Sequence, residues 1–383
     1  MYCRPQDVAS PVIGVLLEFR AVVAGVLSLC IVSCSVGTET VQPEDDVSSV
    51  AAAIINGDDD RAEYFEVKAP EFQRVVAQSV VALMPSSAAQ AILEDRISDL
   101  RTLEVSRRLC PGQRFGDQPA SAYCSGVLVD WDLVLTVAHC ASELPLEDVR
   151  VIFGYYYIED AHLAVGPGDV YGVGEVVASG DADNDYAWIR LDRRANSPRS
   201  PAAIYTQSPS PQKGDHLFGV STTAGIPLKL DASGTIFDAR EAELDYFVAD
   251  TDTFEGSSGG GAFALDLGLM GILSRGAPDY QRTEERCMLV RQRASAVGVP
   301  EERFTYAHRA IAGLCRATST ALCDSDCEQP CRVPARSPTG GGCTVGSADS
   351  GSRAPRLKLW VLALSLFFVR KPHQRCRTAR SDS

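Results

Sequence analysis

The sequence lacks an excess of positive charge, and its interior lacks a long apolar segment. It has 36 Lys and Arg against 50 Asp and Glu, which gives a net charge of -14 at pH 7. Because binding to nucleic acid requires basic patches, this balance argues against a nucleic-acid partner. No interior segment reaches the ~18 apolar residues that a membrane span requires. Only five of the basic residues are lysines, a bias that carries no information about mechanism.

Cysteine, in contrast, is abundant. Thirteen cysteines are too many for a typical reduced cytosolic protein without metal motifs, and they indicate an oxidising compartment. Cys323, Cys327 and Cys331 form a Cys-x3-Cys-x3-Cys cluster, for which metal binding and disulfide bonding are both open. Because no histidine lies nearby and the compartment is oxidising, disulfides are favoured and no metal site is expected.

The N-terminal region has the pattern of an export signal. Arg20 precedes an apolar run over residues 21–32, which has the length of a signal-peptide core. The run ends in Ile-Val-Ser-Cys at residues 31–34, which resembles a bacterial lipobox and implies cleavage before Cys34 and acylation of its thiol. An ordinary secretory signal is the alternative. Residues 1–34 are thus predicted to be a signal peptide and residues 35–53 an acidic linker.

The C-terminal region carries a second set of targeting features. Residues 317–356 form a cysteine-containing, Ser/Gly/Pro-rich linker, and residues 357–383 combine an apolar run with a basic end. Together they resemble the sorting tails of myxobacterial-type surface proteins, in which a cysteine in a Gly-rich context, here Cys343, is processed. An amphipathic or disordered tail is the alternative. We expect export to the cell envelope, the outer surface or the medium, with membrane association through the terminal signals only.

Short β-branched runs separated by turn residues dominate the region between the two ends. They are typical of an antiparallel barrel or sandwich, and they lie at residues 79–84, 125–129, 133–137, 149–157, 170–177 and 186–191. Residues 88–108 have helical spacing and predict an insert that packs on the barrel. Residues 54–57 are expected to be a strand that enters the first barrel, and residues near 195–203 a linker between two halves.

Three short strings carry the side chains of a nucleophilic hydrolase. They are Thr136-Val137-Ala138-His139-Cys140, Asn184-Asp185-Tyr186-Ala187 and Gly256-Ser257-Ser258-Gly259-Gly260. A serine needs a base within hydrogen-bond reach, and an imidazole can accept its proton and return it to the leaving group. A carboxylate would hold that imidazole in the required tautomer. Singly, the three residues also fit a packed histidine, a turn cap and a flexible Gly-Ser loop.

The order histidine, aspartate, serine resembles that of the trypsin-like serine peptidases of the chymotrypsin fold. The resemblance covers residues 54–316, and the segment 109–125 is also similar to secreted trypsin-like peptidases of deltaproteobacteria. It implies an all-β fold of two antiparallel six-stranded β-barrels. A C-terminal helix at residues 304–315 would close the fold.

The resemblance also implies the role of each residue in the site. His139 would be the general base, Asp185 the orienting carboxylate and Ser258 the nucleophile, although Ser257 is adjacent. The amides of Gly256 and Ser258 would form the oxyanion hole. Cys124 and Cys140 would form the disulfide that pins the histidine loop.

Specificity is less strongly indicated. Asp252 falls where trypsin-like enzymes carry the aspartate at the base of the primary pocket, which implies cleavage after Arg or Lys. Residues 269–276 resemble the pocket wall, where Ser274 and Gly276 offer backbone groups to the substrate. Pairing of Arg275 with Asp252 would neutralise that charge. Glutamyl endopeptidases resemble the triad equally well, but Leu273 stands where they usually have a histidine.

We therefore expect a monomeric serine endopeptidase that cleaves a protein or peptide substrate through an acyl-enzyme and needs no cofactor. A non-catalytic member of the fold that binds proteins and an esterase-like hydrolase are the alternatives. Ile-Ile-Asn-Gly at residues 54–57 is similar to the start of an active trypsin-like chain. However, Ser257 replaces the aspartate that pairs with the freed N-terminus in animal enzymes. A buried ammonium without a counter-charge is costly, so activation of that type is not expected.

Overall fold

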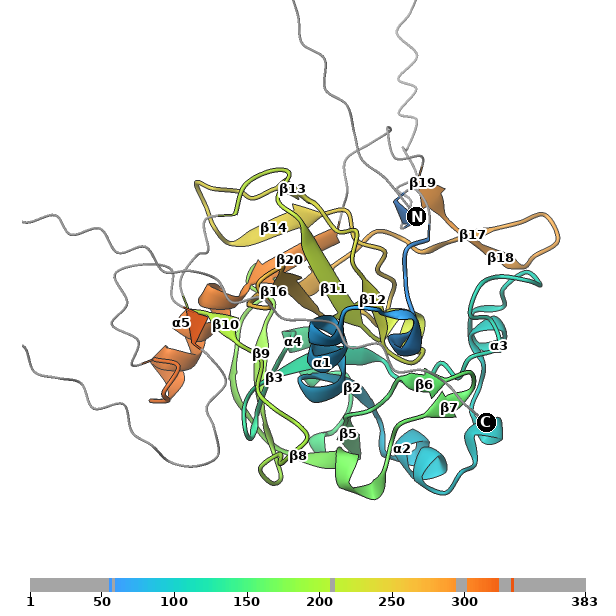
Figure 1. Ribbon diagram of the computed structural model, residues 1–383, viewed down its shortest axis with the longest axis horizontal. Helices are drawn as coiled ribbons and strands as arrows, with labels where there is room; N and C mark the ends of the chain where they lie inside the picture. The colour runs from blue at the N-terminus through green and yellow to red at the C-terminus, as the bar shows by residue number, and fades with distance from the viewer. Residues whose placement is uncertain (1–54, 57–58, 207–210, 294–301, 324–331, 334–383) are drawn as a thin grey trace, which may run out of the picture. The chain divides into compact units, whose positions relative to one another are not determined.

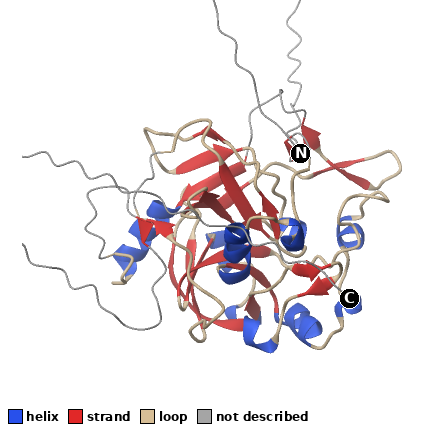
Figure 2. Cartoon of the chain, viewed as in Figure 1, coloured by secondary structure: helices blue, strands red, loops and turns tan. Residues whose placement is uncertain are grey.

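The computed structural model describes residues 55–56, 59–206, 211–293, 302–323 and 332–333, which are mainly β-strands with short helices (Figure 2). The predicted signal peptide, acidic linker, sorting tail and lipobox lie outside the described residues, as do Cys327, Cys331 and Cys343. No helix in the described ranges is long and apolar enough to cross a membrane.

Six antiparallel strands close into a barrel in the order β2–β3–β4–β9–β8–β5 (Figure 1). They are β2 (Val80–Pro85), β3 (Cys124–Asp130), β4 (Leu133–Thr136), β5 (Val149–Ile152), β8 (Val170–Ser179) and β9 (Ala187–Leu191). β-Branched residues pack well on a pleated surface, which is why these runs form strands. The strands predicted in this region and the all-β fold class are confirmed.

The second half is a curled sheet with the order β12–β11–β15–β16–β20–β14–β13. Its strands are β11 (Leu217–Ser221), β12 (Lys229–Asp231), β13 (Ile236–Asp238), β14 (Tyr246–Ala249), β15 (Gly261–Ala264), β16 (Leu269–Arg275) and β20 (Glu302–Tyr306). In addition, β10 (Ile204–Tyr205) pairs with β16, and β21 (Arg332–Val333) pairs with β10. It is open between β12 and β13, in contrast to the expected closed six-stranded barrel. In the chain between these two strands, the N–H and hydroxyl of Ser233 both donate to Asp231 Oδ1. An isolated bridge from His216 to Thr235 links the start of β11 to this part of the chain.

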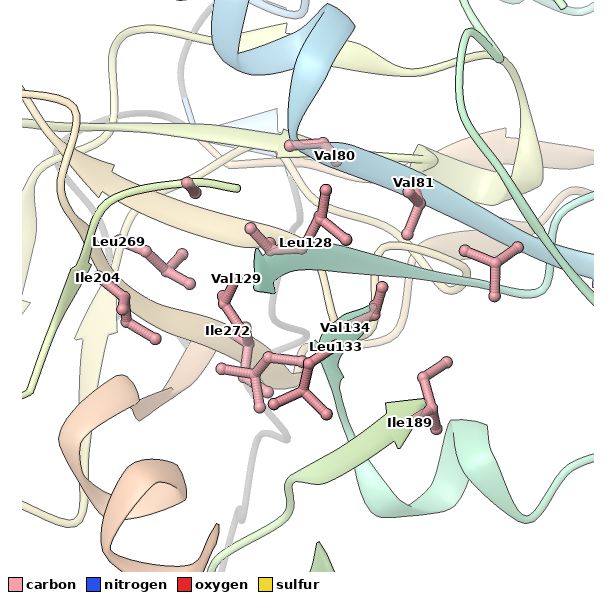
Figure 3. Close-up of a cluster of buried hydrophobic side chains, with 14 of the residues drawn as sticks. Val80, Val81, Leu128, Val129, Leu133, Val134, Ile189, Ile204, Leu269 and Ile272 are labelled. Carbon is pink, nitrogen blue, oxygen red and sulfur yellow. The ribbon is translucent and has the colours of Figure 1, made fainter. Parts of the chain in front are cut away.

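One hydrophobic cluster joins the two halves (Figure 3). Val80, Leu128 and Ile189 enter it from the closed barrel, and Ile204 and Ile272 enter it from the second sheet. Full burial of one such aliphatic side chain contributes about 1.5–3 kcal/mol. The shared core therefore fixes the two sheets against each other, and the candidate site lies where loops of both meet.

Helices and small hairpins lie outside the two sheets. The α-helices are α1 (Pro70–Gln78), α2 (Ser86–Leu93), α3 (Leu103–Arg107), α4 (Ala138–Ala141) and α5 (Ala307–Ala317), and the 3-10 turns are η1 (Tyr64–Glu66), η2 (Ile97–Asp99), η3 (Leu146–Asp148), η4 (Pro167–Asp169) and η5 (Thr223–Gly225). The hairpins are β6 (Tyr157–Glu159) with β7 (His162–Leu163) and β17 (Tyr280–Arg282) with β18 (Met288–Val290). The predicted insert at 88–108 is thus three short helical pieces. The terminal helix begins at Ala307 because the residues before it form β20.

The segment at residues 54–57 does not enter the first barrel, so that prediction is wrong. Strand β1 (Ile55–Asn56) instead pairs in parallel with β19 (Gln292–Arg293). A closed barrel offers no free edge to another strand. The chain that follows β1 is held by the second sheet, where Ala62 N–H donates to Leu230 O at 2.8 Å. The buried Glu63 carboxylate also lies 3.1 Å from Lys229 Nζ.

Three disulfides cross-link the described chain: Cys110–Cys287, Cys124–Cys140 and Cys315–Cys323. The Cys124–Cys140 pair is the one that the family resemblance implies. The sequence assigned no partner to Cys110, Cys287 or Cys315. Cys110 and Cys287 are 177 residues apart, so no local pattern links them, whereas Cys315 and Cys323 are separated by 8 residues. Disulfides of this number are typical of an oxidising compartment.

Candidate active site

The candidate base and its carboxylate are brought together by two neighbouring strands. His139 lies on α4, directly after β4, and Asp185 lies just before β9; Thr136 of β4 pairs with Ala187 of β9. As a result, His139 Nδ1 lies 2.6 Å from Asp185 Oδ2. The other oxygen, Oδ1, accepts a hydrogen bond of 2.7 Å from the N–H of Ala138. A carboxylate held in this way keeps the Nδ1 proton in place and leaves Nε2 as the basic nitrogen.

The predicted nucleophile lies in the loop before β15, and both sheets hold that loop. Ser125 of β3 donates its N–H to Ser258 O at 2.7 Å, and Gly259 N–H donates to Leu273 O of β16 at 2.8 Å. Cys140, which follows His139, has its Sγ 3.8 Å from Ser258 O. The nucleophile loop and the histidine loop are therefore adjacent. Within the described residues, Ser258 Oγ forms no hydrogen bond with His139.

Gly256 has the backbone that an oxyanion hole requires. Its φ is +100°, and a Cβ there would lie 2.7 Å from Gly225 N, so only glycine fits. Its carbonyl is turned inward and accepts a hydrogen bond of 2.9 Å from Thr222 Oγ1. Across the described ranges, the N–H groups of Gly256 and Ser258 donate to no protein acceptor. Two unpaired amides in one loop are what a tetrahedral oxyanion needs.

The side chain of Ser257 is used inside the protein. It is fully buried, and its hydroxyl oxygen accepts hydrogen bonds from Ser221 Oγ at 3.0 Å and from Phe254 N–H at 3.1 Å. Its own N–H donates to Phe254 O at 2.7 Å. Of the two adjacent serines, Ser258 is therefore the one that borders a cavity.

Two cavities lie at the candidate site, one at His139 and Asp185 and one at Ser258. One of about 650 Å³ is lined by His139, Asp185, Ser274 and Arg275. The other, of about 520 Å³, is lined by Ser258 and Gly276 together with Thr253, Phe254, Glu255, Leu273, Ala277, Pro278, Asp279, Tyr280 and Met288. Ser274 and Gly276, which were both expected to offer backbone groups to the substrate, thus line different cavities. Ser274 is further tied to the second sheet, because its hydroxyl donates to Arg303 O at 3.0 Å.

Asp252 is not among the residues that line the cavity beside Ser258, in contrast to the sequence-based expectation. It is buried under the N-terminal segment, where its Oδ2 accepts a hydrogen bond of 3.0 Å from Asp60 N–H. Its own N–H donates to Asp231 Oδ2 at 2.7 Å. The expected pairing with Arg275 is also replaced, since Arg275 Nη2 donates to Ala182 O at 2.7 Å.

The carboxyl group that does line this cavity is that of Asp279, which sequence reasoning missed. It lies four residues beyond the end of β16, in Ala-Pro-Asp at residues 277–279. Burial raises the pKa of Asp279 to about 7. The only sequence signal was an acidic residue close behind the pocket-wall strand.

Metal-ligating side chains gather at one place in the described chain, at Cys124, His139 and Cys140. The two cysteines are bonded to each other, so they offer no thiolate to an ion. Cys124, His139 and Cys140 are therefore close together because the disulfide pins the histidine loop.

Residues 110–296 match the trypsin family, a span that contains His139, Asp185 and Ser258. No curated protein matches the sequence. The match agrees with a closed six-stranded barrel, a second curled sheet and one C-terminal helix. Trypsin-like proteases act on protein or peptide substrates. The chain therefore contains a trypsin-like domain of the chymotrypsin fold.

Proposed function

We propose that this chain is a serine endopeptidase. The observation that carries the proposal is the 2.6 Å contact between His139 Nδ1 and Asp185 Oδ2, beside a serine loop with two unpaired amides. Ser258 Oγ attacks the peptide carbonyl and its proton passes to His139 Nε2. The N–H groups of Gly256 and Ser258 bind the oxyanion. His139 then returns the proton to the leaving amine, and water hydrolyses the ester that remains.

The test is covalent labelling of the full-length chain, expressed in an oxidising host, with a fluorophosphonate. We expect mass spectrometry to find the adduct on Ser258 and labelling to vanish in Ser258→Ala. Ser106→Ala removes an exposed serine on α3 and is the matched control, which should label normally. A folded wild-type chain that takes no label would instead support a non-catalytic protein-binding role. The absence of a hydrogen bond between Ser258 Oγ and His139 in the described residues is the observation that favours this second candidate.

An esterase-like hydrolase would use the same residues, so the rates of cleavage of amide bonds and of ester bonds must be compared. We expect matched peptide amides and esters both to be cleaved, because one triad serves both. Cleavage of esters alone would contradict an endopeptidase. Export is part of the same proposal, and the three disulfides agree with it. Anchoring by the lipobox or by the sorting tail, and action as a monomer, are part of the same proposal.

We further expect activity without a cut near residues 53–54. Neutral hydrogen bonds satisfy Ser257, so the nucleophile loop needs no ion pair with a freed N-terminus. Ile55, the second residue after that cut, pairs with Gln292 in another sheet. A specific protease site placed at residues 50–53 tests this expectation. The rate of fluorophosphonate labelling should be the same before and after the cut, and a large rise after the cut would refute it.

A further inference from the structure

Arg61 is a buried arginine that contacts the loop carrying Ser258. Its residue is 3% exposed, and its guanidinium lies over the ring of Phe254, with Cζ 4.3 Å from the ring centroid. A desolvated guanidinium binds an aromatic face more strongly than an exposed one does. One residue earlier, Asp60 N–H donates to Asp252 Oδ2 at 3.0 Å. This internal segment therefore touches the chain leading into Ser258 at two neighbouring places.

Phe254 fixes Ser257, the neighbour of the proposed nucleophile. Phe254 N–H donates to Ser257 Oγ at 3.1 Å, and Ser257 N–H donates to Phe254 O at 2.7 Å. The second bond closes a tight turn that contains Gly256. The two amides proposed for the oxyanion hole belong to Gly256 in this turn and to Ser258 directly after it. A displacement of Phe254 would therefore be transmitted to both amides.

Arg61 is itself held in one orientation. Its Nε and Nη2 donate to the two carboxylate oxygens of Asp59 at 2.8 and 2.7 Å, and this paired geometry fixes the guanidinium plane. Arg114 clamps the same segment, because its Nη1 and Nη2 donate to Asp59 O and Arg61 O, both at 2.7 Å. Burial opposes the charge of Asp59, but the two arginines lower its pKa overall, so the carboxylate stays ionised. The cation over Phe254 is thus in place before any substrate binds.

The residues that follow Arg61 anchor the segment to the second sheet. Ala62 and Leu230 exchange backbone hydrogen bonds of 2.8 and 3.1 Å. Next to them, Lys229 Nζ lies 3.1 Å from Glu63 Oε1, and the two side chains are only 2% and 7% exposed. Removing one partner of such a buried ion pair is strongly destabilising, so this anchor is firm. Arg61 is therefore held on both sides along the chain.

Resting on the proposed peptidase function, we propose that Arg61 is a positioning residue for that reaction, and that it acts through the ring of Phe254 to hold the amides of Gly256 and Ser258 toward the oxyanion. The hydrogen bonds of Ser258 and Gly259 with the two sheets hold the loop from the nucleophile onward. Arg61 holds the residues before it. This support comes from inside the chain and requires no freed N-terminus.

The test is Arg61→Met in the full-length chain, which keeps a long side chain and removes the charge. We expect kcat on one peptide to fall about 30-fold, because the amides of the oxyanion hole would be misplaced. KM should change by less than about threefold, since the oxyanion forms only after the substrate has bound. The rate of fluorophosphonate labelling of Ser258 should fall by a factor similar to that for kcat. An unchanged kcat and labelling rate would overturn the assignment.

Arg199→Met is the matched control. Arg199 is also buried, at 7% exposed, pairs with Asp169 and lies over the ring of Phe153 with Cζ 5.4 Å from the centroid. Neither Asp169 nor Phe153 belongs to the nucleophile loop. We therefore expect Arg199→Met to lower the thermal midpoint, as Arg61→Met does, but to leave kcat unchanged. Equal losses of kcat in the two variants would show that Arg61 acts through stability alone.

A double-mutant cycle tests the route through the ring. If Arg61 acts through Phe254, Arg61→Met should have almost no further effect on the labelling rate in a chain that already carries Phe254→Leu. Independent effects, in which the two factors multiply, would contradict this route.

Hydrogen exchange separates this proposal from the peptidase proposal, because it requires no activity. In the Ser258→Ala chain, adding Arg61→Met should speed exchange of the amides at residues 254–260 about tenfold, whereas adding Arg199→Met should not. Unchanged exchange after Arg61→Met would refute the positioning role. A folded wild-type chain that takes no fluorophosphonate would refute the peptidase role alone.

Discussion

Asp185→Asn is expected to lower kcat/KM by about 10⁴-fold without unfolding the protein. The reason lies in the two contacts of this carboxylate. Asp185 Oδ1 accepts the N–H of Ala138, and Oδ2 faces His139 Nδ1. An asparagine would keep its oxygen toward Ala138, because its amide nitrogen is no acceptor. The NH2 group would then point at Nδ1 and force the proton onto Nε2, where the imidazole can no longer take the serine proton.

The measurement is kcat/KM on one peptide substrate, with the thermal midpoint as a check on folding. Asp192→Asn is the control, because Asp192 lies directly after the other end of β9, is exposed and pairs with Arg193. We expect the control to retain wild-type activity. A wild-type rate in Asp185→Asn would mean that His139 needs no orienting carboxylate, which contradicts the proposed mechanism.

The second large effect is expected for Gly259→Ala, which should lower the free energy of unfolding by about 4 kcal/mol. The φ of Gly259 is +80°, a conformation that costs L residues energy. An added Cβ would also lie 2.2 Å from Ser125 O and 2.3 Å from Thr136 Oγ1. Since Ser125 also holds Ser258, relief of this clash would move the nucleophile loop, and labelling of Ser258 should be lost as well.

Gly112→Ala is a matched control for the backbone strain alone. Its φ is +82°, but no heavy atom lies within 4 Å of an added Cβ. We expect a loss of about 1–2 kcal/mol there, the cost of the left-handed conformation by itself. Urea unfolding with the disulfides intact measures both variants. Equal losses in the two variants would show that the contacts of Gly259 with Ser125 and Thr136 are unimportant.

The closed barrel was predictable because its signals are local. Runs such as residues 79–84 and 186–191 carry β-branched and apolar residues with turn residues between them, and the strands form at those places. The second sheet was harder, because whether β12 and β13 pair depends on contacts between strands and not on a local pattern, and the sheet stays open between them. Helix α1 was not predicted. Its core-facing residues Phe72, Val75 and Val76 do have the i, i+3, i+4 spacing of a helix, but the segment is only nine residues long.

The residues of the candidate site also differ in whether the sequence indicated them. His139, Asp185 and Ser258 each stand in a short string whose order resembles a known triad, so the sequence by itself indicated the chemistry. Which acid lines the cavity beside Ser258 could not be predicted from the sequence. Asp252 is covered by the N-terminal segment, where it contacts Asp60, and Asp279 lines the cavity.

The sequence alone therefore determined the strands of the first barrel, the fold class and the identity of the residues proposed for catalysis. These features depend on neighbouring residues, through short β-branched and apolar runs bounded by turn residues and through short motifs. Only the tertiary structure decided the partner of β1, the Cys110–Cys287 bond and the placement of Asp252 and Asp279. Those choices depend on which surfaces meet after folding, and contacts between residues far apart in the chain leave no local pattern.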